Sequence, residues 1–464
     1  MLPAMGISFY QGERAAAWAF LVTILAVVVV SVLLLLQKPL DMGIHSKEGF
    51  VTVALSWIII SLFGALPFWL SGSIPSFVDA FFETVSGFTT TGASILTDVE
   101  ALPMGMLYWR SFTHWLGGMG VLVFMLAVVP MSRGSGDSLH LLRAESPGPV
   151  VGKLAPKMHR TARILYAIYV AMTVVQIVLL LLGGMPLFDS ITVAFGTAGT
   201  GGFAITNNSI AAYDSYYLQG VISIFMALFG VNFGVYYLIL AGDIRQALRS
   251  EELRTYSGIM LGATILITIN VAPQFATLFD AFHHSFFQVS SIMTTTGFAT
   301  ADFNLWPEFS RYLLVVLMVL GASAGSTGGG IKTARVIILW KSVKSGIQKM
   351  LHPRSVKVMK MDGKVIDESV VAGVGVFMAS YCIIAAVSMG LVALDNFSME
   401  ATITSVLACI NNIGPGLDIV GPTGNFSSFS ILSKLVLSVN MLVGRLEIFP
   451  MLLLFAPSVW KRGH

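Results

Sequence analysis

Charged residues are scarce in this sequence. Asp, Glu, Lys and Arg make up 11% of its 464 residues, hydrophobic residues make up 55%, and the mean hydropathy is +0.81. Soluble globular proteins carry about 25% charged residues, so this composition excludes that class and indicates a polytopic membrane protein. The only two cysteines, Cys382 and Cys409, lie in apolar segments, which argues against a disulfide framework and a cysteine-based zinc site.

Catalytic and metal-binding patterns are also absent from the sequence. The eight histidines form no HExxH or similar metal spacing, and no Ser–His–Asp arrangement is suggested. His283 and His284 are adjacent in a short apolar segment, where packing or a polar contact is the ordinary role. We therefore expect no enzyme activity, no cofactor and no nucleic-acid partner.

The apolar segments fall into two length classes. A helix needs about 20 mostly apolar residues to cross the hydrocarbon core. Segments of that length lie at 15–37, 50–70, 104–131, 164–184, 216–241, 257–277, 311–342, 370–394 and 430–458. Shorter segments lie at 76–88, 186–196, 278–293 and 396–410. The shorter ones are candidates for re-entrant segments, and after the first span the order long, short, long occurs four times.

The short segments resemble one another in sequence, which supports an internal repeat. DAFFETVSGFTTTG, from Asp79 to Gly92, matches HSFFQVSSIMTTTG, from His284 to Gly297. DSITVAFGTAGTGG ends at Gly202 and ATITSVLACINNIG ends at Gly414, over the same length. The first and third copies match strongly in sequence, whereas the second and fourth are assigned from their spacing and their flanking residues.

The sequence thus predicts an all-α membrane protein of four membrane–loop–membrane repeats and one extra N-terminal helix. The expected boundaries are 1–45 for the N-terminal region, 46–142 for repeat 1, 143–250 for repeat 2, 251–345 for repeat 3 and 346–464 for repeat 4. The opening MLPAMGISFYQGE looks like the end of a further helix that precedes the span at 15–37.

Basic residues predict the orientation. The links after the short segments are poor in Lys and Arg, whereas the links after each closing span are rich in them, and the positive-inside rule makes the basic links cytoplasmic. The basic residues are Arg133, Arg143, Lys153, Lys157, Arg160 and Arg163 in the first link, Arg245, Arg249 and Arg254 in the second, and Lys332, Arg335, Lys341, Lys344, Lys349, Arg354, Lys357, Lys360 and Lys364 in the third. The short segments then enter the membrane from outside. These residues could equally serve only as a topology signal or a lipid-facing patch.

The Thr/Gly endings have a physical interpretation in such a fold. Irregular backbone at membrane depth is tolerated only where protein buries it or where it lines a water-filled path. A half-helix followed by an extended Thr/Gly stretch directs carbonyl oxygens along a pore, and glycine permits the backbone conformation. Four such loops around an axis would replace the hydration shell of a cation. The alternative, a simple turn before a helix, explains one copy better than four.

Several motifs carry a specific family resemblance. They are FFETVSGFTTTGAS, RSFTHWLGGMG, GGFAITNN, TTTGFATADF, GASAGSTGGGIKTAR, NNIGPGLDIVGPTGNFSSFS and NMLVGRLEIFP. Over nearly the whole chain, the sequence resembles the Trk-type potassium uptake subunits, in the superfamily of TrkH, KtrB and the HKT transporters. The resemblance implies four repeats with pseudo-fourfold symmetry around a central pore in the bacterial cytoplasmic (inner) membrane, with K+ as the transported ion. Relatives in this family usually have two helices before the first repeat.

The resemblance also implies which residues bind K+ through backbone carbonyls. They are Thr90, Thr91, Gly92, Thr200, Gly201, Gly202, Thr295, Thr296, Gly297, Asn412, Ile413 and Gly414. In the second repeat either Gly201 or Gly202 could be the filter glycine, and Gly202 is favoured because it precedes a Phe and keeps the common spacing. Relatives that prefer Na+ tend to have Ser at the first filter position, so Gly92 favours K+.

A glycine-rich run, GASAGSTGGGIKT at 321–333, interrupts the closing span of the third repeat. It is not a phosphate-binding loop, because Ile331 separates the last glycine from Lys332. Close helix packing through small residues is an alternative. The resemblance implies a gate below the filter, formed by Gly325, Ser326, Thr327, Gly328, Gly329, Gly330 and Lys332 together with Arg445.

Arg445 lies about midway along the last span, where an Arg costs about 2.5–3.5 kcal/mol on insertion scales, so it should face the interior. Glu447 is two residues away and should point elsewhere. Acidic residues that follow the loops could form an outer ring that attracts cations, or could be scattered and solvated: Asp98, Glu100, Asp302 and Asp418.

The function predicted from these features is potassium uptake. Alternatives are a cation transporter of the same fold with Na+ permeation or Na+/H+ coupling, and a secondary transporter for an organic solute, which would typically show inverted repeats. The basic link from Lys332 to Lys364 could attract anionic lipid or an acidic protein surface. The resemblance favours a homodimer with a cytosolic nucleotide-binding regulator of the TrkA type.

Overall fold

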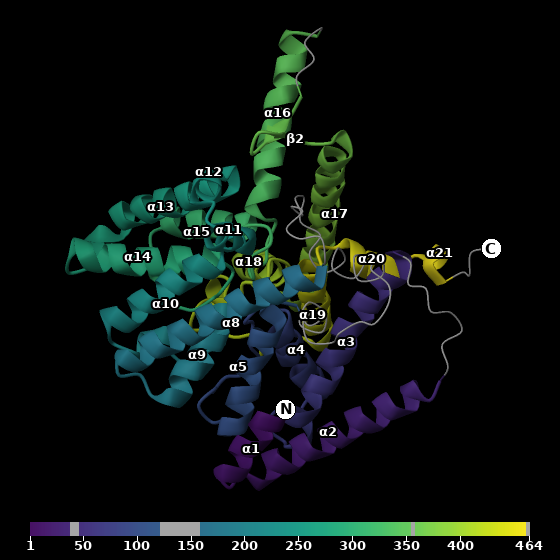
Figure 1. Cartoon of the computed structure of the whole chain (residues 1–464). Coiled ribbons are helices and arrows are strands. Elements are labelled where there is room, and N and C mark those ends of the chain that lie inside the picture. The colour runs from purple at the N-terminus through teal and green to yellow at the C-terminus, as the bar shows by residue number, and fades with distance from the viewer. Residues whose placement is uncertain (38–45, 121–157, 354–357, 461–464) are drawn as a thin grey trace.

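The computed structural model describes residues 1–37, 46–120, 158–353 and 358–460, and these residues are mostly helical (Figure 1). The prediction of an all-α membrane protein is confirmed at that level. Within the described residues, five helices are long and apolar enough to cross a membrane, or six if one bent pair counts as a single span.

The N-terminal region consists of two helices in contact with each other, α1 (Leu2–Tyr10) and α2 (Arg14–Leu35) (Figure 1). The span expected at 15–37 is therefore α2. Between the two helices, the Glu13 carboxylate accepts hydrogen bonds from the backbone N–H groups of Met104 (2.6 Å) and Gly105 (3.2 Å). Glu13 thereby satisfies free N–H groups at the start of α5 (Met104–Gly118) and fastens the N-terminal helices to the first repeat.

Each of the four predicted repeats opens with a long helix and continues with a short one. The long helices are α3 (Ser46–Leu70), α8 (Met158–Leu182), α13 (Glu251–Val271) and α17 (Glu368–Val392). The short helices are α4 (Phe77–Phe88), α9 (Leu187–Gly199), α14 (Leu278–Met293) and α18 (Met399–Ile410). These bounds confirm the helices expected near 50–70, 164–184, 257–277 and 370–394, and the short segments between the spans.

Local sequence explains where the short helices begin. Ser76, Thr277 and Ser398 are N-cap residues whose side chains accept a hydrogen bond from the backbone three residues later, which satisfies one of the free N–H groups. An acid also lies in the first turn of every short helix: Asp79, Asp189, Asp280 and Glu400. The helix dipole favours negative charge at the N-terminus, so the N-cap residues and the acids indicate the same starting point.

The closing helices end or break near the middle of the expected spans. They are α5 (Met104–Gly118), α10 (Tyr216–Phe229) with α11 (Phe233–Leu240), α15 (Glu308–Leu320) with α16 (Thr333–Leu351), and α19 (Ile431–Arg445) with α20 (Phe449–Leu454). The interruption expected at 321–333 separates α15 from α16. The end of the span expected at 104–131 lies outside the described residues, as does the boundary at 142 and 143.

Two continuous spans expected from the sequence are wrong. Helices α10 and α11 are bent by 91° at their break, where the Asn232 side chain caps α11 by accepting from the N–H of Gly234 (2.8 Å). Helix α19 ends at Arg445, and Glu447 and Ile448 then take positive φ angles of 54° and 72°. Both breaks fall inside segments that are apolar on average, so hydropathy did not indicate them, although helix-breaking residues lie beside each break: Gly230 and Asn232 at the first, and Pro450 at the second.

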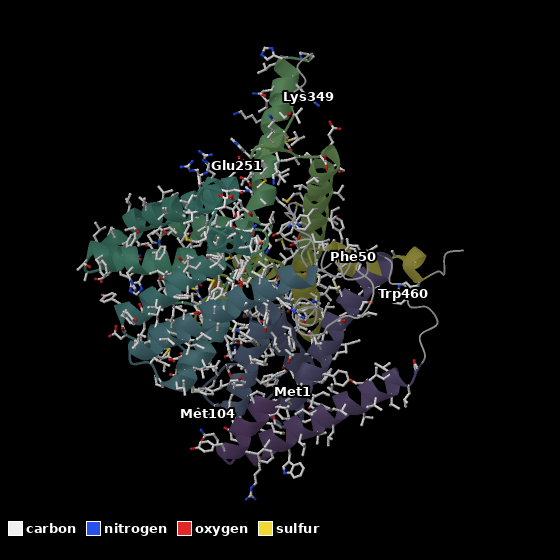
Figure 2. All side chains as sticks on the ribbon, viewed as in Figure 1. Met1, Phe50, Met104, Glu251, Lys349 and Trp460 are labelled. Carbon is white, nitrogen blue, oxygen red and sulfur yellow. The ribbon has the colours of Figure 1, made fainter. Side chains whose placement is uncertain are left out.

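The remaining elements are short. They are α12 (Ile244–Arg249), α21 (Pro457–Trp460), 3-10 turns at Ser209–Ala212, Ala272–Gln274, Phe303–Leu305, Ala393–Asp395 and Asp418–Val420, and an antiparallel hairpin of β1 (Lys360–Met361) and β2 (Lys364–Val365). Helix α16 projects beyond the rest of the molecule (Figure 1), and Lys349 lies near its outer end (Figure 2).

The buried and the exposed residues of this protein differ in chemical character. The loops that follow the short helices begin with fully buried residues, with Thr90, Thr200, Thr295 and Asn412 at 0% exposure. The long helices instead expose apolar side chains, such as Leu33 on α2 and Ile383 on α17. An apolar exterior with a polar, irregular centre is the arrangement that a bilayer imposes, because backbone groups there must find partners within the protein.

Candidate functional site

The loops that follow the four short helices share one backbone conformation. In each loop a non-glycine residue with positive φ is followed two positions later by a glycine with positive φ. The φ angles are 55° and 83° for Thr90 and Gly92, 54° and 77° for Thr200 and Gly202, 59° and 87° for Thr295 and Gly297, and 56° and 95° for Asn412 and Gly414. Gly202 and not Gly201 therefore occupies the position equivalent to the other three glycines.

The backbone hydrogen bonds explain this conformation. Each short helix ends in a Schellman motif, in which the left-handed residue donates to the carbonyl three residues back and the next residue donates to the carbonyl five residues back. The second type of bond joins Thr91 N to Ser86 O (2.9 Å), Gly201 N to Gly196 O (2.9 Å), Thr296 N to Ser291 O (2.8 Å) and Ile413 N to Ala408 O (2.9 Å).

Threonine and asparagine occupy the left-handed position where glycine is usual, and this costs about 1–2 kcal/mol per residue. Their side chains make contacts that glycine could not. Thr295 Oγ1 accepts from Gly329 N (2.6 Å), and Asn412 Nδ2 donates to Thr91 Oγ1 (3.0 Å) and to Met441 O (2.9 Å). The repeated strain is thus accompanied by contacts with neighbouring loops, as at many functional sites.

The four loops touch one another in a closed order. A methyl group added to Gly92 would overlap the carbonyl oxygen of Gly201, and one added to Gly202 would overlap that of Thr296. A methyl group on Gly297 would overlap Ile413 O, and one on Gly414 would lie 2.7 Å from Thr91 O. The order runs from the first loop to the second, third and fourth, and back to the first. Only glycine fits these positions.

His114 of α5 joins the first two loops. Its Nδ1 lies 2.7 Å from Gly87 O, and its Nε2 accepts from the backbone N–H of Phe203 (3.1 Å). Because a backbone N–H can only donate, Nε2 is the acceptor and Nδ1 carries the proton. His114 is fully buried and lies in RSFTHWLGGMG, but the sequence alone gave it no role.

A buried ion pair holds the same two loops from the outer side. Arg110 Nε lies 2.6 Å from Glu83 Oε1, and both side chains are almost completely buried. The other Glu83 oxygen accepts from Ile95 N (2.9 Å), and Arg110 donates to Ala204 O (2.8 Å). The pair thereby fastens the chain after Gly92 to the chain after Gly202.

The acids expected at the outer surface bind loop amides. Asn207 donates to Asp98 through its side chain (2.9 Å) and to Glu100 through its backbone (3.0 Å), and this side-chain bond lowers the pKa of Asp98. Asp302 accepts from Asn304 N (3.0 Å), and Asp418 N donates to Asn304 Oδ1 (3.0 Å). The contacts of Asp98 and Glu100 connect two outer loops, whereas the Asp302 carboxylate accepts within its own loop and Asp418 binds Asn304 through its backbone N–H. These contacts favour structural roles for Asp98, Glu100 and Asp302.

The loop between α15 and α16 lies against the buried side of these four loops. Gly329 N donates to Thr295 Oγ1, and a methyl group on Gly329 would overlap Asn411 O. On its other side the loop is joined to the break between α10 and α11, because Ser323 N donates to Gly230 O (3.0 Å) and Phe233 N donates to Gly325 O (3.0 Å).

Side chains within the 321–333 segment stabilise the loop. Ser326 Oγ donates to Ser323 O (2.6 Å), Thr327 Oγ1 donates to Phe229 O (3.2 Å), and the buried Lys332 ammonium donates to Gly328 O. The expected gate residues Gly325 to Gly330 and Lys332 therefore form one connected segment.

Arg445 links this loop to the loop that follows α4. Its guanidinium donates to Thr327 O (2.8 Å), to Thr90 Oγ1 (3.1 Å) and to the carbonyls of Gly117 and Gly118 at the end of α5. The positive charge lies at a helix C-terminus, where the dipole favours it. Arg445 faces the interior, as expected.

Glu447 forms an ion pair with Arg335, which also donates to Ile331 O (3.1 Å) and lies over the Phe377 ring. Sequence reasoning had placed Arg335 only among the basic link residues. The apolar residues next to Arg335 on α16 were the one signal in the sequence that this side chain is buried. In the same link Lys341 is paired with Glu251, whereas Lys344 and Lys349 are exposed. The expected basic residues Arg133, Arg143, Lys153, Lys157, Arg354 and Lys357 lie outside the described residues.

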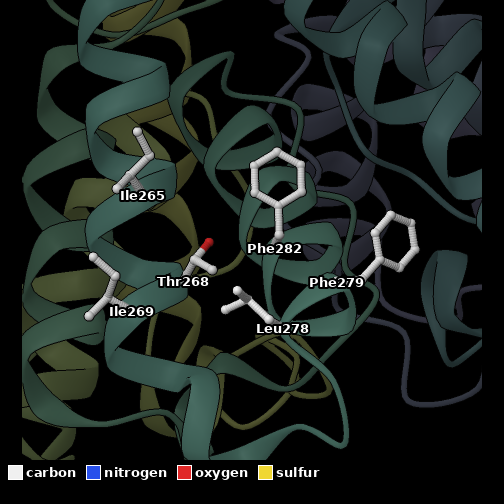
Figure 3. Close-up of a pocket in the computed structure, with 6 residues that line it drawn as sticks. All are labelled: Ile265, Thr268, Ile269, Leu278, Phe279 and Phe282. Atoms are coloured by element: carbon white, nitrogen blue, oxygen red, sulfur yellow. The ribbon is translucent and has the colours of Figure 1, made fainter.

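An apolar pocket lies elsewhere, between α13 and α14 (Figure 3). It is lined by Ile265, Thr268, Ile269, Leu278, Phe279 and Phe282. The only polar side chain is Thr268, whose hydroxyl donates to Thr264 O (2.7 Å). The pocket offers a solute no free polar partner among these side chains and suits contact with lipid.

Comparison with known proteins identifies the relatives of this chain. A family model described as "TrkH: Cation transport protein" matches residues 17–462. The Trk system potassium uptake protein TrkH of Salmonella typhimurium is 37% identical over 428 residues, which cover 90% of this chain and 87% of that protein. The Trk system potassium uptake protein TrkG of Escherichia coli is 33% identical over 468 residues, covering 99% and 95%. The crystal structure of the potassium transporter TrkH from Vibrio parahaemolyticus matches with a TM-score of 0.88 at 30% identity, covering 99% of this chain and 96% of that one.

Replacing His114 should destabilise the protein through the first two loops. His114→Phe leaves Gly87 O and Phe203 N without their partner, and each buried unpaired group costs about 1–3 kcal/mol. We expect a clear fall in the thermal unfolding midpoint of the purified protein in detergent. His352→Phe, at an exposed position, is the matched control. Equal midpoints for the two variants would show that the His114 bridge contributes nothing to stability.

Proposed function

This chain belongs to the TrkH family of cation transport proteins, and we propose that it carries K+ into the cell across the bacterial cytoplasmic membrane. The relatives named above are described as potassium uptake proteins. The observation that carries the proposal is the backbone conformation common to the four loops, closed into one ring by contacts between successive glycines and carbonyls.

In this proposal the four repeats surround a pore with pseudo-fourfold symmetry, and the four loops are its selectivity filter. Carbonyls of the residues from Thr90, Thr200, Thr295 and Asn412 to the following glycines replace water around the ion. The C-terminal ends of four short helices add partial negative charge at the same place. Such a site binds a cation without any ionised ligand, which lets the ion leave again.

Two alternatives remain distinct from this proposal. A single layer of glycine carbonyls discriminates less sharply than a long row, so Na+ permeation or Na+/H+ coupling in the same fold is the nearer alternative. A secondary transporter for an organic solute fits less well, because such proteins typically have a midplane site between inverted repeats. The apolar pocket of Figure 3 lacks the polar groups that an organic solute would need.

The loop between α15 and α16 is the proposed gate. It lies against the filter through Gly329 and Thr295, and Arg445 holds it there through Thr327. The guanidinium also adds positive charge on the inner side of the filter, which opposes the passage of a cation. Because glycines form four of the six residues from Gly325 to Gly330, little side-chain packing would resist its displacement.

Regulation is proposed to come from a partner. Lys344 and Lys349 are exposed on α16, and Lys349 lies near its outer end (Figure 2). An acidic protein surface could bind there. We assign this role to a cytosolic nucleotide-binding regulator of the TrkA type, acting on a homodimer of this chain. Anionic lipid is the competing occupant of the same charges.

Gly92→Ser should lower the preference for K+ over Na+. A side chain at this position overlaps the Gly201 carbonyl and must displace the neighbouring loop, so we expect the permeability ratio to fall about tenfold, a change of about 1.4 kcal/mol in relative ion stabilisation. The ratio is measured from competing ion fluxes in proteoliposomes.

Gly72→Ser is the control for this variant. Gly72 has a similar φ of 75° but no atom within 4 Å of an added Cβ, so it reproduces the backbone strain away from the ring. A Gly92→Ser protein that inserts normally and keeps the ratio of the Gly72→Ser protein would remove Gly92 from the filter.

Weakening the gate should raise the basal K+ flux. Deleting Gly328 to Gly330 removes the segment under the third and fourth loops, and Arg445→Ala removes the anchor at Thr327 O. We expect each change to increase flux several-fold in proteoliposomes that contain this chain alone. Arg249→Ala, at an exposed position, controls for loss of a basic side chain. If both gate variants insert and conduct like Arg249→Ala, the barrier lies elsewhere.

Nucleotide should change K+ flux only when the regulator is present, because the proposal places nucleotide binding on the regulator. Charge reversal at Lys344 and Lys349 should weaken regulator binding at physiological salt, whereas Arg249→Glu in the second basic link should not. Binding is measured by co-purification and flux by reconstitution with and without ATP, ADP or NAD. A nucleotide response of the isolated chain, or unchanged binding after reversal, contradicts this division of roles.

A further inference from the structure

Helix α13 begins with two glutamates that contact different parts of the protein. Ser250 is its N-cap, and Glu251 and Glu252 form the first turn. Consecutive residues on a helix do not face the same direction. Glu251 is half-buried at the surface, beside α16 (Figure 2), whereas Glu252 is buried.

Glu252 holds the proposed gate at a second residue, separate from the one that Arg445 holds. One carboxylate oxygen accepts from Ala324 N in the gate loop (2.6 Å), and the other accepts from Asn232 Nδ2 (3.4 Å). Asn232 caps α11 at the break in the second repeat. One carboxylate thus joins the gate loop, the helix break beside it and α13, and a hydrogen bond to an ionised acceptor is about twice as strong as a neutral one.

Glu251 holds the cytoplasmic hairpin and α16. Lys341 of α16 lies 2.6 Å from the Glu251 carboxylate and also donates to Lys360 O in β1 (2.7 Å). Asp362, at the turn of the hairpin, accepts from the backbone N–H of Glu251 (2.6 Å). The Asp362 carboxylate lies at the N-terminus of α13, where the helix dipole favours negative charge.

We propose that Glu251 and Glu252 form a latch that couples the position of the hairpin and α16 to the gate loop. The inference rests on the proposed gating role of the 321–333 segment. With Asp362 and Lys341 in place, the first turn of α13 is fixed and Glu252 holds Ala324. Moving the hairpin or α16 removes both anchors, and the first turn then frays and releases the gate.

The latch also indicates which chemical groups an activating partner would need. An acidic surface on a partner competes with Glu251 for Lys341, since the two are carboxylate-bearing ligands for one ammonium group. The coupling therefore needs no direct contact between the partner and the gate. Glu251 and Glu252 act as positioning residues, through Lys341 and Ala324 respectively.

The test measures basal rubidium tracer flux through this chain alone in proteoliposomes. Glu252→Ala and Asp362→Ala should each raise the flux, by about tenfold for Glu252→Ala, the factor expected from losing one charge-assisted hydrogen bond in the closed state. Glu252→Gln keeps an acceptor oxygen for Ala324 and should restore most of the closed behaviour. Glu368→Ala, at the exposed first residue of α17, should leave the flux unchanged.

Hydrogen exchange gives a measurement that would not change if Glu252 and Asp362 had only a structural role. Asp362→Ala should speed exchange at Ala324 and in the first turn of α13, with no change in the middle of α13. In the variant that combines Glu252→Ala with Asp362→Ala, the flux should not exceed that of Glu252→Ala alone, because the two residues act on one path. Additive fluxes, or unchanged exchange at Ala324 in Asp362→Ala, would overturn the coupling.

The gate deletion separates failure of the latch from failure of the gate. If deleting Gly328 to Gly330 raises the flux but Glu252→Ala and Glu252→Gln both behave as wild type, the latch is wrong and the gate stands. If neither the deletion nor the Glu252 variants raise the flux, the gate itself is wrong. Should Glu252→Ala fail to insert, Asp362→Ala and Glu252→Gln decide the question.

Discussion

The structure depends on four backbone turns at the centre of a membrane protein. Each short helix ends with a residue in the left-handed region and a glycine two positions later, and no such turn is stable alone at membrane depth, because its carbonyls lack partners there. The loops stabilise one another by direct contact between a glycine of one loop and a carbonyl of the next. A side chain on any of these glycines would separate the loops.

The supports of this ring differ between its two sides. On the outer side, His114 and the Glu83–Arg110 pair connect the first two loops, and Asn207 and Asn304 connect outer loops. The contacts of His114 and of the ion pair use buried polar groups, which favours rigidity on that side, whereas those of Asn207 and Asn304 lie at the surface. On the inner side, a glycine-rich loop is held mainly by hydrogen bonds to its backbone, from Arg445 and Glu252. A few bonds at separate anchors are easier to release together than a packed apolar surface.

Much of the fold was predictable because recognisable local sequence patterns mark each repeat. Composition indicated the membrane class, and the Thr/Gly endings marked the loops, since left-handed and glycine-specific positions leave a recognisable pattern. The interruption at 321–333 was visible for the same reason, and the position of Arg445 in an apolar span indicated an inward direction. The helix breaks after Phe229 and Arg445 were not predicted, because the surrounding segments are apolar enough to be taken as continuous spans, although Gly230, Asn232 and Pro450 lie beside the breaks.

The sequence by itself therefore determined the membrane class, the fourfold recurrence of one loop type and the residues of the loops. Only the tertiary structure decided how the loops are ordered against one another, that Gly202 is the equivalent glycine, and which side chains anchor the 321–333 loop. Local patterns depend on neighbours along the chain, whereas the bond from Ala324 to Glu252 joins residues 72 positions apart and that from Arg445 to Thr90 joins residues 355 positions apart. Such contacts exist only after the helices have packed, since packing alone brings those polar groups within hydrogen-bonding distance.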